Sequence, residues 1–291
     1  MDHPKISIVT PSLNQGEFLE RTIRSVLDQN YPNLEYIIID GGSTDNSIEI
    51  IKKYEKHLKY WVSEPDSGMY DALRKGFEKS TGELIAWNNS DEMYQAGSFF
   101  TVAEIFSTLN EVNWLQGQPT HFDNKGRTVA VLLLRKWSKY NFYSGDFKWI
   151  QQESTFWRRS LWEKAGSRIN TELKYAGDLE LWLRFFRHEK LFVTSALIGG
   201  FRIRNADQLS LTNFDAYINE AEKCIALEKL NDLDSKRLKE INYYRKLVSA
   251  FSRFNIGRLT VKYFDKFEYP PRVVFNRELQ KFELKNPSPF F

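Results

Sequence analysis

Carboxylate side chains recur at the ends of apolar runs in the first third of the chain. Asp40, Asp66 and Asp91 each stand at or just past such a run. Carboxylate oxygens are the ligands that Mg²⁺ and Mn²⁺ prefer. Asp91, with Glu92 beside it, is therefore a candidate site for a divalent cation that would hold an anionic group rather than activate a water. The alternative is that Ser90 or Asp91 only caps the helix that follows.

The other acidic residues near these turns each have two interpretations. Asp40 could accept hydrogen bonds from a bound base or ribose, or it could only shape its Asp-Gly-Gly turn. Asp66 and Asp71 stand at the entrance of a predicted helix, where acids stabilise the helix start electrostatically. The local strings alone leave both roles open.

Asp178 is the candidate general base. It begins a predicted helix, where it could be only a cap. If it faces the ends of the strands, it could remove a proton from a substrate hydroxyl. Gln152 and residues 202–204 add amide and guanidinium groups that could face phosphates.

A predicted βαβ unit at the start of the chain would position these side chains. Residues 6–9 and 37–39 are β-branched runs that suit strands buried on both faces. Residues 18–27 between them carry their apolar side chains on one helical side. Parallel sheets bind ligands beyond the carboxyl ends of their strands, where Thr10 and Pro11 lie. The chain thus opens with the architecture of a nucleotide site, without a GxGxxG motif or a P-loop lysine.

The alternation of strands and helices continues until the pattern changes near residue 214. Further helices are predicted at residues 45–54, 69–80, 99–109, 160–165 and 178–187. Further strands are predicted at residues 60–62, 84–87, 114–115, 128–134 and 192–201. Residues 124–126 suit a hairpin turn, and the aromatic segment 140–149 is expected to be a loop. From residue 214 onward, polar helical patterns predominate.

The bulk composition favours an enzyme-sized α/β protein. The chain has 291 residues and is 42% hydrophobic, and its net charge of +3 is too small to indicate a nucleic-acid partner. The single cysteine, Cys224, excludes an internal disulfide and a multi-cysteine metal site. The sequence has neither a signal-like N-terminus nor an apolar run long enough to span a membrane. We expect a cytoplasmic protein, with contact to the inner membrane face left open.

Five strings, in order along the chain, resemble the family 2 glycosyltransferases, which have the GT-A fold. They are VTPSLNQGEFLERTIRSVLDQNYPNLEYIIIDGGSTDNS, SEPDSGMYDALRKGFEKSTGELIAWNNSDE, QQESTFWRRSLWEKAG, AGDLELWLR and GGFRIRNADQLS. The first two are specific as a pair. The resemblance covers roughly residues 5–210 and implies a GT-A-like, Rossmann-related, mostly parallel sheet flanked by helices, with a C-terminal helical appendage.

The resemblance implies an inverting transferase. Its donor would be a nucleotide-diphospho-sugar, with a UDP-sugar expected, and its acceptor a hydroxyl of a saccharide or lipid-linked glycan in surface polysaccharide synthesis. Asp178 would be the catalytic base, and Asp91 would bind Mn²⁺ or Mg²⁺. The donor-binding residues that it implies are Thr10, Pro11, Asp40, Asp66, Asp71, Lys75, Asn89, Ser90, Gln152, Arg204 and Gln208.

Two positions depart from the family's pattern. Asn89 stands where the family's DxD motif has its first acid, which removes one metal contact. Arg204 stands where many relatives offer a histidine; arginine cannot bind a metal but can pair with a phosphate. We therefore expect Arg204 to supplement a weakly held ion.

Two other functions compete with this one. A sugar nucleotidyltransferase would want a glycine-rich, basic loop after the first strand, but residues 11–17 have one glycine and neither lysine nor arginine. A non-catalytic nucleotide- or sugar-binding relative is kept open by Asn89 and Arg204, whereas the retained Asp91 and Asp178 argue against it.

We expect a catalytic domain at residues 1–213, with a nucleotide-binding half at about 1–95 and an acceptor half at about 96–213. Residues 214–291 would form a helical extension. One stretch of it is basic and aromatic: Lys236, Arg237, Lys239, Tyr243, Tyr244, Arg245, Lys246, Arg253 and Phe254. Either these residues form the outer face of helices that pack on the catalytic domain, or they form an acceptor-side platform or a dock for a membrane surface.

Overall fold

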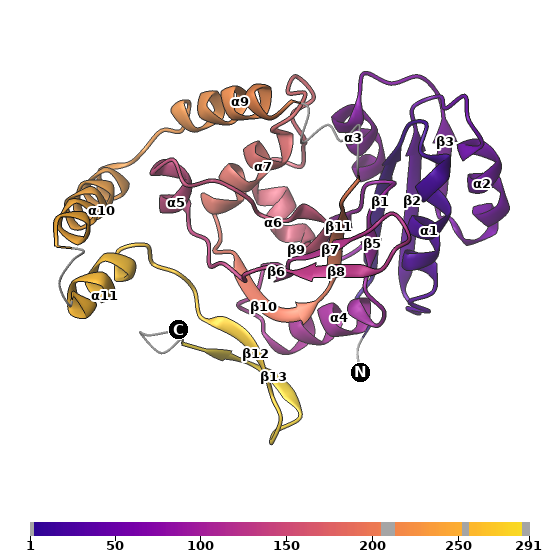
Figure 1. Cartoon of the computed structure of the whole chain (residues 1–291). Helices are drawn as coiled ribbons and strands as arrows, with labels where there is room; N and C mark the ends of the chain where they lie inside the picture. The colour runs from indigo at the N-terminus through magenta and orange to yellow at the C-terminus, as the bar shows by residue number, and fades with distance from the viewer. Residues whose placement is uncertain (1–2, 205–212, 252–255, 287–291) are drawn as a thin grey trace.

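The computed structural model describes residues 3–204, 213–251 and 256–286 (Figure 1). The predicted βαβ unit at the start of the chain is confirmed: β1 (Ile6–Ser12), α1 (Gly16–Leu27) and β2 (Leu34–Asp40) follow one another. β1 and β2 pair in parallel, and every residue of β1 is buried. Their carboxyl ends therefore meet at one edge of the sheet.

Seven further strands extend β1 and β2 into the central sheet. They are β3 (Tyr60–Ser63), β4 (Leu84–Trp87), β6 (Trp114–Gln118), β9 (Thr155–Arg158), β10 (Phe192–Leu197), β12 (Arg272–Asn276) and β13 (Lys281–Lys285). In the described part of the chain, nine strands lie in the order β13-β12-β10-β6-β9-β4-β1-β2-β3. Only β9 and β13 run antiparallel to their neighbours. The predicted mostly parallel sheet is confirmed.

Helices cover both faces of this sheet, because alternate residues of each strand face opposite sides. The helices are α2 (Ser47–Tyr54), α3 (Met69–Lys79), α4 (Ser98–Thr108), α6 (Arg159–Lys164) and α7 (Gly177–Phe186), with short 3₁₀ turns η1 (Glu55–His57) and η2 (Gln152–Ser154). Val9 packs with α3, α6 and α7, whereas Ile8 packs with α1, α2 and α4. Gly76 lets α3 approach β1 closely, because an added Cβ would lie 2.3 Å from Val9 Cγ1.

A smaller sheet lies beside the main one. In the described residues it contains four strands in the order β5-β11-β7-β8. Their bounds are β5 (Met93–Tyr94), β7 (Thr120–Phe122), β8 (Thr128–Val131) and β11 (Gly199–Arg202). The predicted turn at residues 124–126 joins β7 to β8, and Asp123 and Arg127 close it with a backbone hydrogen bond of 3.0 Å.

One predicted loop contains a helix. Within the segment 140–149, the structure forms the short helix α5 (Lys139–Tyr143). Ser138 and Asn141 make reciprocal capping hydrogen bonds, and Tyr140 and Phe142 are buried. Reciprocal caps and buried aromatic side chains stabilise a helix too short to show sequence periodicity.

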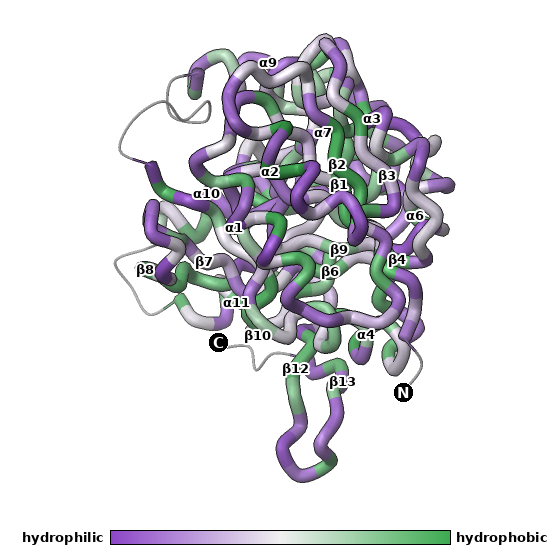
Figure 2. The backbone as a smooth tube through the Cα atoms, turned by 90° about the vertical axis from the view of Figure 1, so that its right-hand side faces the viewer, coloured by the Kyte–Doolittle hydropathy of each residue, from purple (hydrophilic) through white to green (hydrophobic). Residues whose placement is uncertain are grey.

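The C-terminal region is helical first and ends in a hairpin. The predicted helices are present as α9 (Phe214–Ala226), α10 (Asp232–Ala250) and α11 (Gly257–Asp265). The hairpin of β12 and β13 was not predicted; it pairs with β10 and projects from the body in Figure 2. Ala221 and Cys224 of α9 are buried in the same cluster as α7, so the boundary predicted at residue 214 does not separate two hydrophobic cores.

The basic stretch of α10 is partly neutralised. Arg237 forms ion pairs with Glu240 and Glu268, which come from α10 itself and from the segment after α11. Arg253 and Phe254 lie outside the described residues. Among the residues that the structure describes, no helix is both long and apolar enough to cross a membrane.

Candidate active site

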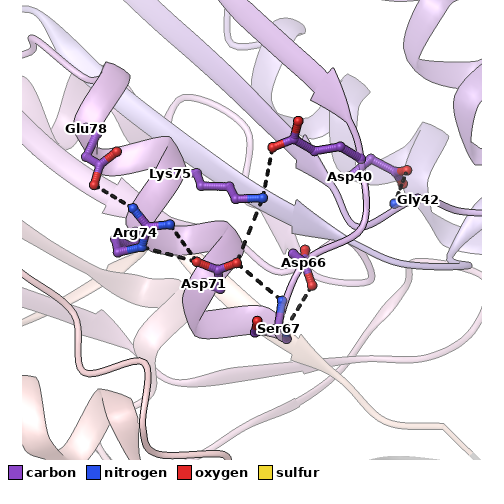
Figure 3. A network of polar contacts seen from close by, with 10 residues as sticks. Asp40, Gly42, Asp66, Ser67, Asp71, Arg74, Lys75 and Glu78 are labelled. Carbon is purple, nitrogen blue, oxygen red and sulfur yellow. Dashed lines mark hydrogen bonds and ion pairs between the residues drawn. The ribbon is translucent and has the colours of Figure 1, made fainter.

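Asp40, at the end of β2, is fully buried, and its carboxylate organises the turn that follows. Its Oδ2 accepts hydrogen bonds from the backbone N–H groups of Gly42 (3.1 Å) and Ser43 (2.8 Å) and from the Ser63 hydroxyl (2.7 Å). Its Oδ1 accepts a hydrogen bond from the Ser43 hydroxyl. Figure 3 shows Asp40 beside Gly42. With both oxygens engaged, this geometry favours the turn-forming interpretation of Asp40.

The turn before α3 is held by its own acids. Asp66 Oδ1 accepts a hydrogen bond from the backbone N–H of Gly68 (2.8 Å), and Asp71 Oδ2 accepts one from that of Ser67 (3.2 Å). Arg74 donates to Asp71 Oδ1 from both Nε (3.1 Å) and Nη2 (2.7 Å). This fork of hydrogen bonds is the main reason why the pKa of Asp71 is lowered.

Lys75 lies one helical turn beyond Asp71 and shares its environment. Its Nζ pairs with Glu64 Oε1 at 2.9 Å and lies 3.8 Å from Asp71 Oδ2. The side chain of Lys75 is 21% exposed. Figure 3 shows Asp66, Asp71 and Lys75 on one side of the turn, so these three predicted donor-site residues lie together.

Thr10 and Pro11 are buried within β1. The Thr10 hydroxyl lies 3.1 Å from the hydroxyl of Tyr36, on the neighbouring strand. Tyr36 belongs to the hydrophobic cluster that α1 covers. The side chain of Thr10 therefore faces the core, and only the strand end can approach a ligand.

The loop after β4 carries Asn89, Ser90 and Asp91. Ser90 is buried, and its carbonyl oxygen accepts a hydrogen bond from the Thr22 hydroxyl (2.9 Å). Asp91 is partly buried, and its Oδ2 is paired with the guanidinium of Arg204. Asn89 Oδ1 is buried and has no hydrogen-bond partner within the described part of the chain.

Two arginines reach this loop from β11 and the residues after it. The guanidinium groups of Arg202 and Arg204 lie over the ring of Phe18, at 4.9 and 4.5 Å from its centroid. Arg202 is fully buried and donates to the backbone carbonyls of Asp91 and Asp123. Arg204 therefore meets the carboxylate of Asp91, whereas Arg202 holds the backbone.

Two buried glutamates act electrostatically with Asp91: Glu92, which the sequence placed beside it in the candidate cation site, and Glu153, which the sequence analysis did not identify as a site residue. Glu92 and Glu153 are 2% and 3% exposed. Burial is the main cause that raises the pKa of Glu153 to about 8, and the charges of Asp91 and Asp178 add to it. Burial also raises the pKa of Glu92, with Glu153 and Asp91 contributing. Glu153 stands next to Gln152 in the string QQES, which is the signal that could have identified it.

Asp178 lies at the start of α7. Its side chain is partly buried, and its Oδ1 is buried without a hydrogen-bond partner in the described residues. Burial raises the pKa of Asp178 to about 6, although backbone hydrogen bonds at the helix start oppose this. A carboxylate with a pKa near neutrality can accept a proton effectively at physiological pH.

The start of α7 is held from two sides. Gly177 allows the ring of Tyr70 to pack against it, because an added Cβ would lie 2.7 Å from that ring. The Tyr70 hydroxyl donates to the carbonyl oxygen of Tyr175 (2.9 Å) and accepts from the backbone N–H of Asp178 (3.4 Å). From α9, Glu220 accepts three backbone hydrogen bonds of 2.8–3.1 Å from residues 174–176. Asp178 is thus fixed by groups on α3 and on α9.

The charges of Asp91 and Asp178 both help to raise the pKa of Glu153, so both carboxylates lie within electrostatic range of this buried group. Gln152 lies beside them, and its amide donates to the Trp87 carbonyl oxygen (3.2 Å) and to Glu92 Oε2 (3.4 Å). The carboxylate of Asp40 instead bonds within its own turn and to Ser63. Gln208 lies outside the described residues.

The oxygen donors after β4 fit a hard divalent cation. Asn89 supplies a buried carbonyl oxygen that has no hydrogen-bond partner in the part of the chain that the structure describes, and Asp91 supplies a carboxylate. Arg204 occupies one oxygen of that carboxylate. In the described residues no group of three or more His, Cys, Asp or Glu side chains is arranged to hold a metal. A bound ion would therefore take most of its ligands from diphosphate and water.

A match to a known family model identifies the protein family to which the chain belongs. Residues 7–172, more than half of the chain, match the model of the family described as Glycosyl transferase family 2. The chain belongs to glycosyl transferase family 2. Asp178, Arg204 and α9 lie beyond the matched residues, so the match itself does not assign their roles.

Curated relatives of this family 2 protein are also glycosyltransferases. An uncharacterized glycosyltransferase of Mycobacterium tuberculosis is 38% identical over 62% of this chain and 68% of its own length. The poly(ribitol-phosphate) β-N-acetylglucosaminyltransferase TarP of Staphylococcus aureus is 24% identical over 91% and 86%. A GalNAc(5)-diNAcBac-PP-undecaprenol β-1,3-glucosyltransferase of Campylobacter jejuni is 23% identical over 85% and 80%.

Solved structures of glycosyltransferases share the fold of this family 2 chain. Residues 1–349 of S. aureus TarS, in complex with UDP-GlcNAc, superpose with a TM-score of 0.63 at 16% identity, over 90% of this chain and 79% of that one. A mannosyltransferase of Pyrobaculum calidifontis, in complex with GDP-Man and Mn²⁺, gives 0.61 at 14%, over 91% and 74%. The chain spans about half of a longer TarS chain, 48% of it.

Proposed function

We propose that this protein is an inverting glycosyltransferase that moves a sugar from a UDP-sugar to a hydroxyl group of a saccharide or lipid-linked glycan in surface polysaccharide synthesis. The observation that carries the proposal is Asp178 at the firmly held start of α7: its Oδ1 is buried without a hydrogen-bond partner among the described residues, and its pKa is raised to about 6. Its charge and that of Asp91 both act on the buried Glu153, which supports a shared site. Family membership supports sugar transfer as the reaction class.

The proposed reaction is a single displacement. Asp178 removes the proton of the acceptor hydroxyl while that oxygen attacks C1 of the donor sugar from the face opposite the diphosphate. The bond from the acceptor oxygen to C1 forms as the bond from C1 to the phosphate oxygen breaks, which inverts the anomeric centre. The proton ends on Asp178 and returns to water. The transition state resembles an oxocarbenium ion, as in glycoside hydrolysis.

The leaving nucleoside diphosphate gathers negative charge, which cations at the loop after β4 would stabilise. Arg204, paired with Asp91, places a guanidinium there. Asn89 and Asp91 would hold Mn²⁺ or Mg²⁺, which when bound supplies further positive charge to the diphosphate. The Mn²⁺ found with GDP-Man in the related mannosyltransferase supports a metal-assisted donor site.

The donor would be held at the turns after β1 and β2 and before α3. Thr10 and Pro11 lie just before the last residue of β1, Asp66 lies in the turn before α3, and Lys75 lies on α3 beside this turn. Because the carboxylate of Asp40 is engaged within its turn, we propose that Asp40 shapes the nucleoside site rather than contacting the base. Residues 1–95 would thus serve the donor and residues 96–213 the acceptor.

The relatives indicate which acceptors to test. TarP acts on a poly(ribitol phosphate), and the C. jejuni enzyme acts on an undecaprenol-linked oligosaccharide. Both acceptors belong to bacterial glycoconjugates, and the second is anchored to lipid. We propose an acceptor of this kind for the present chain, reached at the membrane surface without a spanning helix in the described residues.

The decisive experiment compares Asp178→Asn with the wild type. Release of UDP from UDP-glucose, UDP-galactose and UDP-GlcNAc is measured with Mn²⁺, together with UDP affinity by calorimetry. We expect turnover to fall by roughly 10²–10⁴, the usual contribution of a general base, and UDP affinity to stay unchanged. Asp28→Asn is the matched control, because the side chain of Asp28, just past the end of α1, is 64% exposed.

Two outcomes would reject the proposal. An Asp178→Asn variant as active as the wild type would remove the proposed base. A wild-type protein that binds UDP but turns over none of the donors would favour the non-catalytic binding relative instead.

A further inference from the structure

Trp149 is an exposed tryptophan whose ring rests on other aromatic rings. It precedes η2, and its side chain is 51% exposed. Its ring centroid lies 5.8 Å from that of Phe214 and 5.3 Å from that of Tyr217, both on α9. Phe214 is itself 36% exposed. Large apolar rings gathered at a surface mark an interaction site more often than scattered ones do.

These rings lead from solvent to the proposed base. Burial raises the pKa of Tyr217, and the charge of Asp178 is the next largest cause, followed by Tyr70. A charge acts on a neighbouring group in this way only over a short distance. Tyr217 also packs against the core cluster that contains Tyr70 and Ala176, and the Tyr70 hydroxyl accepts the backbone N–H of Asp178. Tyr217 therefore lies on the Asp178 side of this group of rings, and Trp149 is its most exposed member.

The rings of Phe214 and Tyr217 are held in place because α9 is fixed against α7, the helix that carries Asp178. Phe214, Tyr217 and Ala221 follow one another at three- and four-residue steps, which places them on one face of α9. Ala221 is fully buried against the core, and Glu220 bonds to the backbone N–H groups just before α7. Figure 1 shows α9 beside α7. Trp149 thus meets rings that are fixed relative to Asp178.

We infer that Trp149, Phe214 and Tyr217 form the acceptor-sugar subsite, here called the aromatic wall, and that it binds the apolar face of a pyranose ring. The inference rests on the proposed function, since Asp178 must be able to remove a proton from a hydroxyl group of the sugar that the aromatic wall binds. A pyranose ring offers a flat face of C–H groups to an aromatic ring and hydroxyls at its edge to a base. An extended polyol phosphate has no such face.

The test measures binding of simple sugars by saturation-transfer NMR in the presence of UDP. The probes are methyl β-D-glucopyranoside, methyl β-D-galactopyranoside and methyl N-acetyl-β-D-glucosaminide, with ribitol 5-phosphate as the acyclic comparison. We expect ring C–H signals from at least one pyranoside with the wild type. Trp149→Ala should weaken its binding about tenfold, as loss of a stacking contact would. Trp149→Phe should restore most of the affinity.

Leu227→Ala is the matched control, because Leu227 is an 80% exposed apolar residue just past the other end of α9. It should leave pyranoside binding unchanged. Thermal unfolding of each variant checks that the fold is kept, and the rescue by Trp149→Phe separates stacking from loss of structure.

UDP affinity, measured on the same samples, separates failure of the wall from failure of the proposed function. If UDP binds but Trp149→Ala holds pyranosides as well as the wild type does, the aromatic wall is not the acceptor subsite. The same conclusion follows if the wild type binds ribitol 5-phosphate and none of the pyranosides. If UDP itself does not bind, the donor assignment fails instead.

Discussion

The donor-side turns and the acidic centre around Glu153 handle charge in opposite ways. At the turns, the carboxylates have partners: Asp40 accepts four hydrogen bonds, and Asp71 is paired with Arg74. At the centre, Glu153 Oε1 and Asp178 Oδ1 are buried without a hydrogen-bond partner in the described residues. Both regions adjoin the central sheet, but the carboxylates of the turns hold the backbone in place, whereas those of the centre keep buried oxygens available to a ligand.

The pKa values follow this difference. Hydrogen bonds from Arg74 lower the pKa of Asp71, whereas burial raises the pKa of Asp178 to about 6 and that of Glu153 to about 8. Hydrogen bonds to a carboxylate stabilise its charged form, and they also fix the geometry of the loop that donates them. Carboxylates that are desolvated without compensation destabilise the fold and are retained where chemistry needs them. The comparison therefore predicts opposite effects of substitution in the two regions.

The largest expected effect is loss of stability in Asp40→Ala. Removing this carboxylate leaves the buried donors of Ser43 and the partly buried donors of Gly42 and Ser63 without their acceptor. An unsatisfied buried donor costs about 1–3 kcal/mol, so we expect the free energy of unfolding to fall by roughly 3–5 kcal/mol in total. Urea denaturation measures the difference.

The control for Asp40→Ala is Asp28→Ala, whose carboxylate is exposed and which should change stability by less than about 1 kcal/mol. UDP affinity is measured below the unfolding transition of each variant. A stable Asp40→Ala protein that no longer binds UDP would show that Asp40 contacts the nucleoside. It would contradict the conclusion that the donor-side carboxylates act by fixing the turns.

The sequence predicted those elements whose pattern is local. The buried runs at residues 6–9 and 37–39 gave β1 and β2, and α1 followed from its one-sided apolar residues. The hairpin of β12 and β13 was missed because its strands carry exposed and polar residues and are stabilised by pairing with β10. The short helix α5 depends on a cap and on tertiary burial rather than on periodicity.

The site divides in the same way. Asp91 and Asp178 were predicted from strand ends, helix starts and family motifs, and the charges of both raise the pKa of Glu153. Glu153 was not predicted, although it stands next to Gln152, because its burial depends on β11: Gly199 approaches so closely that an added Cβ would lie 2.0 Å from the Glu153 carbonyl oxygen. Glu220 was missed because it acts from α9, beyond the residues that carry the family resemblance.

The second expected effect is a gain of stability in Asp178→Asn. The folded protein raises the pKa of Asp178 to about 6, above its value in the unfolded chain, so the charged form is disfavoured in the fold. This penalty is fully present above about pH 6 and disappears as the pH falls below the pKa of the unfolded chain. Asparagine removes it, so we expect a gain of as much as about 3 kcal/mol at neutral to alkaline pH.

Thermal unfolding of Asp178→Asn and the wild type from about pH 4 to pH 8 checks both the sign and the pH dependence. The difference in melting temperature should be largest at the alkaline end and should vanish near pH 4. A variant that is less stable at every pH would mean that the Asp178 carboxylate stabilises the fold, as the donor-side acids do.

The smallest expected effect is that of Arg74→Ala, which removes charge pairing at the surface of the donor side. Arg74 is 41% exposed and pairs with Asp71 and Glu78 within one helix, as Figure 3 shows. Such exposed pairs contribute about 0.2–1 kcal/mol and are weakened by salt. We therefore expect a loss of less than about 1 kcal/mol in low salt and almost none in about 0.5 M NaCl.

Urea denaturation at the two salt concentrations distinguishes a surface pair from a structural network. Asp71 also accepts the backbone N–H of Ser67, so the turn before α3 keeps a hydrogen bond when Arg74 is removed. If Arg74→Ala instead loses several kcal/mol regardless of salt, the turn depends on the guanidinium itself. The donor side would then owe its order to charge pairing as much as to the buried hydrogen bonds of Asp40.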